Sequence, residues 1–233
     1  MEQNQEYSVL KTAVQVDATK QLKNTEVVEF EHLEGTGMRI LFVGNSITLH
    51  GVAPQIGWHW RWGMAATAKE KDYVHLCMAH MLEKYPDAAF GICQVSRWER
   101  SYKTGSDIFP EFAEAREFDP DVIIIKLSAN CPQEDFDENL FYDRFDELIA
   151  FLSKSGKAKT IVCTGFYKHP AEPAILRYAA DTNQPLVMLS DLAEMKEMKA
   201  IGRFEHGGVA SHPGDLGMET IAKRICEVFD REF

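Results

Sequence analysis

The sequence of 233 residues lacks any long hydrophobic run: its longest purely aliphatic stretch covers only residues 122–125. A helix needs about 20 consecutive apolar residues to cross a bilayer, so we predict no transmembrane segment and no membrane partner. The first residues also lack the basic start and apolar stretch of a secretory signal. These absences lead us to expect a cytoplasmic protein.

Basic residues are also few: the sequence has 25 Lys and Arg and 36 Asp and Glu, which gives a net charge of −11. Binding of nucleic acid depends on neutralising phosphates, so we predict no nucleic-acid partner. The five cysteines form no C-x-x-C pair, which predicts reduced, buried thiols. Neither a G-x-x-x-x-G-K-[ST] loop nor an H-E-x-x-H motif is present, and we predict no cofactor and no metal.

From residue 38 onward, apolar runs alternate with segments of helical spacing. Buried strands are predicted from the apolar runs at residues 38–43, 88–95, 121–127, 159–164 and 185–189. Helices are predicted from the spacing at residues 69–84, 136–152, 171–180, 191–199 and 214–229. Apolar strands separated by helices are typical of a parallel sheet covered on both faces. We therefore predict a three-layer α/β/α sandwich with a central, mainly parallel five-stranded sheet, of the flavodoxin-like kind.

The first 37 residues differ from the rest, because they are polar and contain one strand pattern, at residues 26–31. We predict an N-terminal extension of residues 1–37, which forms an edge strand or a subunit contact, and a domain of residues 38–233. The sequence leaves open whether the chain forms a homo-oligomer.

Polar residues follow the predicted strands, where open α/β sheets bind their ligands. Ser46 comes directly after the first strand, and His212 precedes the last helix. A serine on a sharp strand-to-helix turn can attack a carbonyl while its own N–H stabilises the oxyanion. The alternatives for Ser46 are a helix N-cap and a flavin-phosphate loop.

Three short segments resemble, in order, the motifs of the SGNH (GDSL-like) hydrolases, a family of esterases and lipases. The letters GNS at residues 44–46 resemble its nucleophile block, G-D-S or G-N-S. The letters SAN at residues 128–130 are similar to its G-x-N-D block, and HP at residues 212–213 resembles the end of its D-x-x-H-P block. The resemblance covers residues 38–233 and implies an SGNH hydrolase-like fold.

The resemblance also implies roles for individual residues. Ser46 would be the nucleophile, His212 the base, and Asn130 a donor to the oxyanion. The glycine of the family's second block has no clear match, and Ser96 or Arg97 stands where its backbone N–H would lie.

The acid of the family lies three residues before the histidine, where this sequence has Val209. Glu205 is the nearest upstream carboxylate, and we predict it as the acid. The alternatives are Asp191 and a Ser–His dyad that a backbone carbonyl orients.

Three of the four tryptophans, Trp58, Trp60 and Trp62, lie within five residues, and Trp98 follows the second strand. Aromatic rings serve both recognition and burial, so a sugar-stacking wall and core or interface packing are both open. Together with Asn45, beside the nucleophile, we predict these tryptophans as substrate-binding residues.

These observations predict a serine ester hydrolase that removes a small acyl group from a sugar or a similar small-molecule ester. The preference for acetyl follows from the resemblance to bacterial carbohydrate esterases. The alternatives are a catalytically degenerate glycan-binding protein of the same fold and a flavodoxin-like phosphate or cofactor binder.

Overall fold

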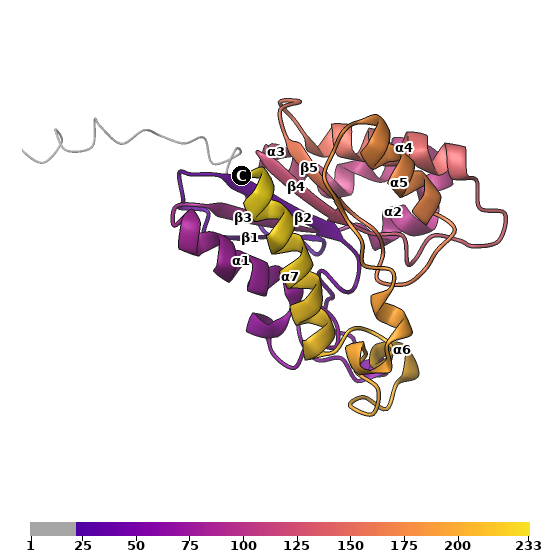
Figure 1. The fold of residues 1–233 in the computed structure, drawn as a ribbon. Helices are drawn as coiled ribbons and strands as arrows, with labels where there is room; N and C mark the ends of the chain where they lie inside the picture. The colour runs from indigo at the N-terminus through magenta and orange to yellow at the C-terminus, as the bar shows by residue number, and fades with distance from the viewer. Residues whose placement is uncertain (1–21) are drawn as a thin grey trace, which may run out of the picture.

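The structure, a computed structural model, describes residues 22–233 (Figure 1). Residues 1–21, which belong to the predicted N-terminal extension, lie outside the described part. Among residues 22–233, no helix combines the length and the apolar character needed to cross a bilayer.

The described chain forms one mixed sheet of six strands in the order β1-β3-β2-β4-β5-β6. The strands are β1 (Val28–Glu31), β2 (Arg39–Gly44), β3 (Ala89–Gln94), β4 (Val122–Lys126), β5 (Lys159–Cys163) and β6 (Leu186–Val187). Strands β2 to β6 are parallel, and β1 pairs antiparallel with β3 at the edge. The predicted five-stranded sheet is thus extended by a sixth strand, because the pattern at residues 26–31 joins it.

Helices connect the strands and cover the sheet. They are α1 (Tyr73–Lys84), α2 (Ser96–Ser101), α3 (Ala113–Glu117), α4 (Glu138–Leu152), α5 (Glu172–Asp181), α6 (Gly207–Ala210) and α7 (Asp215–Glu232). Segments of 3-10 helix lie at Pro54–Ile56, Lys69–Lys71, Tyr102–Phe112, Leu192–Glu194 and Lys196–Met198. The helix predicted at residues 191–199 is therefore wrong, and α2, α3 and α6 were not predicted because they are too short to show a period.

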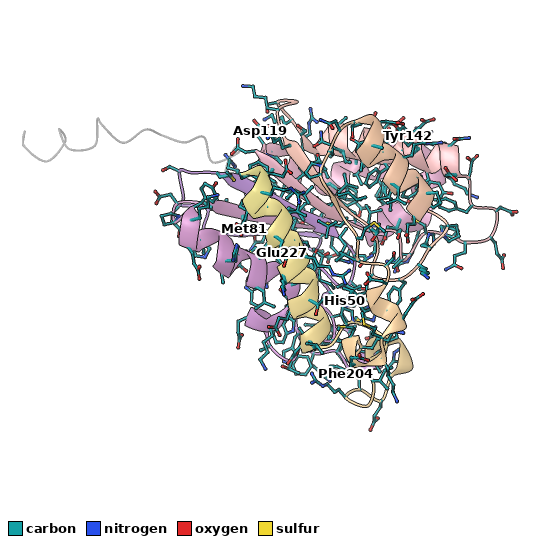
Figure 2. The ribbon with its side chains drawn as sticks, in the orientation of Figure 1. His50, Met81, Asp119, Tyr142, Phe204 and Glu227 are labelled. Atoms are coloured by element: carbon teal, nitrogen blue, oxygen red, sulfur yellow. The ribbon has the colours of Figure 1, made fainter. Side chains whose placement is uncertain are left out.

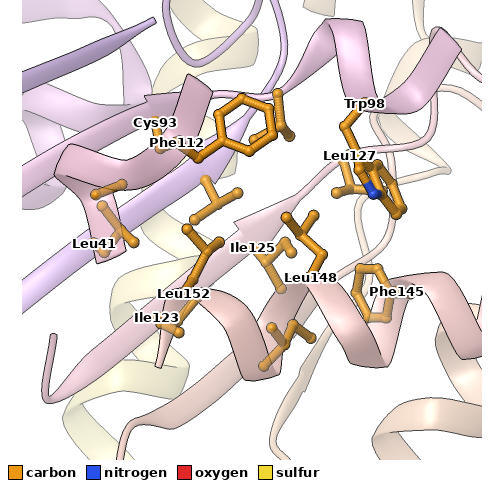
Figure 3. Packing of buried hydrophobic residues seen from close by; sticks show 14 of the residues in the cluster. Leu41, Cys93, Trp98, Phe112, Ile123, Ile125, Leu127, Phe145, Leu148 and Leu152 are labelled. Atoms are coloured by element: carbon orange, nitrogen blue, oxygen red, sulfur yellow. The ribbon is translucent and has the colours of Figure 1, made fainter. Parts of the chain in front are cut away.

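The core lies on both faces of the sheet, as alternate residues of β4 show. Ile123 and Ile125 belong to the cluster that α4 and α5 cover, whereas Val122 and Ile124 belong to the cluster beneath α1 and α7. All four are fully buried. Figure 1 shows α1 and α7 on one side and α4 and α5 on the other, and Figure 3 shows the first cluster from close by. The predicted three layers are confirmed.

The parallel strands bring their carboxyl ends to one edge of the sheet. Gly44, at the end of β2, pairs with Gln94 on β3 and with Lys126 on β4. Figure 2 shows His50, which follows β2, near α6 and far from Asp119, which precedes β4. The loops after β2, β3 and β4 therefore meet at the edge where α6 lies.

Candidate active site

Ser46 lies on a tight turn directly after β2. The N–H groups of Thr48 and Leu49 both donate to the Asn45 carbonyl, at 2.9 and 3.0 Å. The turn does not continue into a helix, so the predicted strand-to-helix turn and the N-cap alternative are wrong. Gly44 is required here, because a Cβ at its position would lie 2.6 Å from the Lys126 carbonyl oxygen. The turn leaves Ser46 partly exposed to solvent.

His212 comes two residues after the short helix α6. Its Nε2 lies 2.7 Å from Ser46 Oγ, and its Nδ1 lies 2.7 Å from the carbonyl oxygen of Gly208. A carbonyl can only accept, so Nδ1 carries the proton and Nε2 is free to accept from the Ser46 hydroxyl. The structure thus brings together the two residues that we predicted as nucleophile and base.

The surroundings of His212 disfavour its charged form. Burial lowers the pKa of His212 to about 4, although the hydrogen bond to Gly208 acts in the opposite direction. The positive charges of protonated His50 and of Lys126 lower the pKa of His212 further. His212 is therefore a neutral base at pH 7.

The structure does not bring Glu205, the predicted acid, to His212. Glu205 is exposed and makes no hydrogen bond or ion pair with any residue of 22–233. Asp191, the alternative acid, pairs with Arg224 at 2.6 Å. Val209 is buried in an apolar cluster with Trp58, so no carboxylate lies three residues before the histidine. The Gly208 carbonyl takes the place that we predicted for a side-chain acid.

Asn130 lies where the loop after β4 approaches the site. Its Nδ2 donates to Glu99 Oε2 at 2.6 Å, and its Oδ1 accepts from Arg100 at 3.3 Å. The second hydrogen on Nδ2 is left for a ligand. Asn45 also donates to Glu99, at 3.1 Å, and is 1% exposed. The prediction that Asn45 contacts substrate is therefore wrong, because its side chain is buried.

Some backbone N–H groups near Ser46 already donate a hydrogen bond within the protein, and others do not. The N–H of Ser46 makes no hydrogen bond within the described part of the chain. The N–H of Ser96, one of the two predicted second donors, donates to the Gln94 side chain at 3.2 Å. The Ser46 N–H is therefore free to donate to a ligand at Ser46, whereas the Ser96 N–H is already in use.

The tryptophans fall into two groups. Trp58 and Trp98 are fully buried, so the prediction that they contact substrate is wrong. Figure 3 shows Trp98 among core side chains, and Trp58 packs against Val209 beneath α6. Trp62 is partly buried, whereas Trp60 is 41% exposed and stacks on it with ring centroids 5.6 Å apart. Two of the four tryptophans are therefore core residues, and of these Trp58 packs with Val209 on the segment that leads to His212.

No group of three or more His, Cys, Asp or Glu side chains among residues 22–233 is arranged to hold a metal ion. At Ser46, a hydroxyl lies beside a neutral imidazole and a free backbone N–H, which is an arrangement that can perform nucleophilic chemistry.

The fold, with Ser46 and His212 at the carboxyl edge of the sheet, is that of the SGNH (GDSL-like) hydrolases. No protein-family model matches the sequence, and no curated protein does. Solved structures do match. A putative GDSL-like lipase from Parabacteroides merdae aligns with 82% of this chain and 94% of its own, with a TM-score of 0.56 and 15% identity.

Two esterases are similar to the same extent. A two-domain esterase active on acetylated mannans aligns with 83% of this chain, with a TM-score of 0.55 and 20% identity. The alignment spans 48% of that esterase, about half its length. The psychrotrophic esterase EstA from Pseudoalteromonas, solved with monoethylphosphonate, aligns with 84% of this chain and 98% of its own, with a TM-score of 0.52 and 13% identity. At these identities the likeness is one of fold.

Proposed function

We propose that this chain is a serine esterase that removes a small acyl group, acetyl, from a carbohydrate ester. The observation that carries the proposal is the 2.7 Å contact between Ser46 Oγ and His212 Nε2, with the His212 ring oriented by Gly208. A hydroxyl paired with an oriented neutral imidazole is the arrangement that activates serine nucleophiles.

The reaction would proceed by acyl transfer in two halves. Ser46 Oγ attacks the ester carbonyl while His212 Nε2 accepts the hydroxyl proton. The Ser46 N–H and the Asn130 amide donate to the oxyanion, and the alcohol leaves with the proton from His212. Water, deprotonated by the same Nε2, then attacks the acyl-enzyme, releasing the carboxylic acid and restoring Ser46.

Two observations support a carbohydrate as the alcohol. Two of the similar structures are described as an esterase active on acetylated mannans and a family two carbohydrate esterase in complex with cellohexaose. In addition, Trp60 exposes 41% of its surface, and exposed aromatic rings suit stacking on sugars.

Turnover of p-nitrophenyl acetate and of acetylated mannooligosaccharides tests the proposal. We expect hydrolysis of both by the wild type and its loss in Ser46→Ala. The matched control is Ser155→Ala, an exposed serine between α4 and β5 at the opposite edge of the sheet. Equal turnover in the wild type and in Ser46→Ala would refute the assignment of Ser46 as the nucleophile. Oligosaccharide binding without hydrolysis would favour a glycan-binding protein instead.

A further inference from the structure

Glu99, on helix α2, is a fully buried carboxylate that none of the chemical steps above uses. It accepts three hydrogen bonds, one from the loop after β2 and two from the loop after β4. Glu99 Oε1 accepts from Asn45 Nδ2 at 3.1 Å and from the Ser128 N–H at 2.6 Å. Glu99 Oε2 accepts from Asn130 Nδ2 at 2.6 Å. One side chain thus joins the loop after β2 to the loop after β4.

A buried carboxylate is costly unless its oxygens are satisfied and its charge is balanced. The three donors satisfy the oxygens of Glu99. The balancing charge comes from Lys126, whose side chain is also buried. Burial lowers the pKa of Lys126 to about 8, and the negative charge of Glu99 opposes that effect. An apolar side chain at position 99 would leave these three donors without an acceptor, so the carboxylate serves to hold the donors in place.

The backbone of Ser128 gives a second, independent observation. Its φ is +113°, a region that favours glycine, and the family motif has glycine at this position. The bond from the Ser128 N–H to Glu99 holds this strained turn two residues before Asn130. Glu99 therefore fixes both the backbone and the side chain of the segment that carries the oxyanion donor.

We propose that Glu99 is a positioning residue that aims both oxyanion donors. By accepting one hydrogen of the Asn130 amide, it directs the other toward the acyl oxygen. By holding Asn45, it fixes the residue before Ser46, whose N–H is the second donor. The inference rests on the proposed esterase function, and Glu99 itself touches no substrate.

Replacement of Glu99 by glutamine tests this role with little change in shape. All three partners of Glu99 donate, so a glutamine amide presents its own N–H groups to a donor and releases that partner. Because the donors act on the transition state, kcat for p-nitrophenyl acetate should fall by roughly 10–100-fold, with KM within about twofold of the wild type.

A double-mutant cycle separates positioning from general damage. In an Asn130→Ala background only the path through Asn45 remains, so Glu99→Gln should lower kcat there by a clearly smaller factor than in the wild type. The control is Glu111→Gln, which removes a carboxylate paired with the exposed Arg97 and should leave kcat unchanged. If circular dichroism shows that Glu99→Gln is unfolded, Glu99→Asp, which keeps the charge but shortens the reach, replaces it in the cycle.

The outcomes are distinct. Unchanged kcat in a folded Glu99 variant, or losses that multiply in the double variant, would overturn the role of Glu99 while leaving the esterase intact. Loss of the fold in both variants would make Glu99 structural and overturn its positioning role as well. A wild type without Ser46-dependent turnover would refute the proposed function itself, and the inference with it.

Discussion

His212, behind Ser46, and His75, on α1, are both partly buried histidines with a hydrogen bond at each ring nitrogen. Their partners differ. His75 lies between two carboxylates, with Nδ1 2.7 Å from Asp72 and Nε2 3.0 Å from Glu31 on β1. Burial disfavours the charged ring, but the bonds to Asp72 and Glu31 outweigh it and raise the pKa of His75 to about 9.

His212 has a hydroxyl and a carbonyl as partners, and its pKa is lowered to about 4. At neutral pH, His75 is therefore a cation that joins β1 to α1, whereas His212 is a neutral base. A carboxylate at each ring nitrogen keeps a histidine protonated, and a protonated ring cannot accept the proton that a general base has to take up. A backbone carbonyl orients His212 without supplying that charge.

The largest expected effect is a loss of activity that occurs on replacement of His212 and not on replacement of His75. His212→Ala should lower kcat/KM for p-nitrophenyl acetate by roughly 10⁴-fold or more, because Ser46 loses its proton acceptor. His75→Gln should leave kcat/KM within about threefold, because its partners hold structure rather than the reacting groups. Comparable losses of kcat/KM in both variants would contradict the claim that His212 acts in the reaction and His75 does not.

The second prediction concerns the pH dependence of activity. His212 has to be unprotonated to act, so kcat/KM should stay constant as the pH falls below 6.5 and decline only near its pKa of about 4. Circular dichroism at each pH checks that the protein remains folded. A decline centred near pH 6.5 in folded protein would contradict the neutral, desolvated base.

The third prediction concerns stability. The pKa of His75 is raised above its ordinary value of 6.5, so its stabilisation is complete below pH 6.5 and is lost as the pH rises through about 9. His75→Gln should lower the free energy of unfolding at pH 6 by about 1–2 kcal/mol and flatten its decline toward pH 9. Urea denaturation at both pH values measures this.

The control for His75 lies on the same helix. His80 pairs with Asp230 at the surface, with both side chains more than two-fifths exposed, so His80→Gln should change stability little. An equal loss in both variants would mean that the two carboxylates add nothing to His75.

The smallest expected effect is that of Glu205→Gln. Because the Gly208 carbonyl occupies Nδ1 of His212, this variant should keep kcat/KM within about twofold of the wild type. A loss of kcat/KM above about tenfold in steady-state kinetics would show that Glu205 acts as the acid after all.

The sequence predicted those parts of the fold that depend on apolar pattern. The run at residues 122–125 predicted β4 correctly. Ser46 and His212 were predicted because one follows a strand and the other precedes a helix, and the structure brings their side chains to within 2.7 Å. Trp58 and Trp98 were misassigned, because composition cannot distinguish a ring that packs in the core from one that faces a ligand. Trp60, two residues from Trp58, is the exposed one.

Two features of the site leave no pattern in the sequence. The Gly208 carbonyl belongs to the backbone, so residue type says nothing about it. Glu99 lies in a short polar segment without periodicity, and its burial depends on donors from loops that are 29 to 54 residues away along the chain. Only the assembled sheet edge brings those donors together.

Labelling with a fluorophosphonate probe, followed by peptide mapping by mass spectrometry, tests the central claim most directly, since the probe reacts with activated serines. We predict a covalent adduct on Ser46 in the wild type and in His75→Gln, and none in His212→Ala. Hydrolysis of the acetyl ester by a protein that carries no adduct on Ser46, or an adduct that survives the loss of His212, would contradict it.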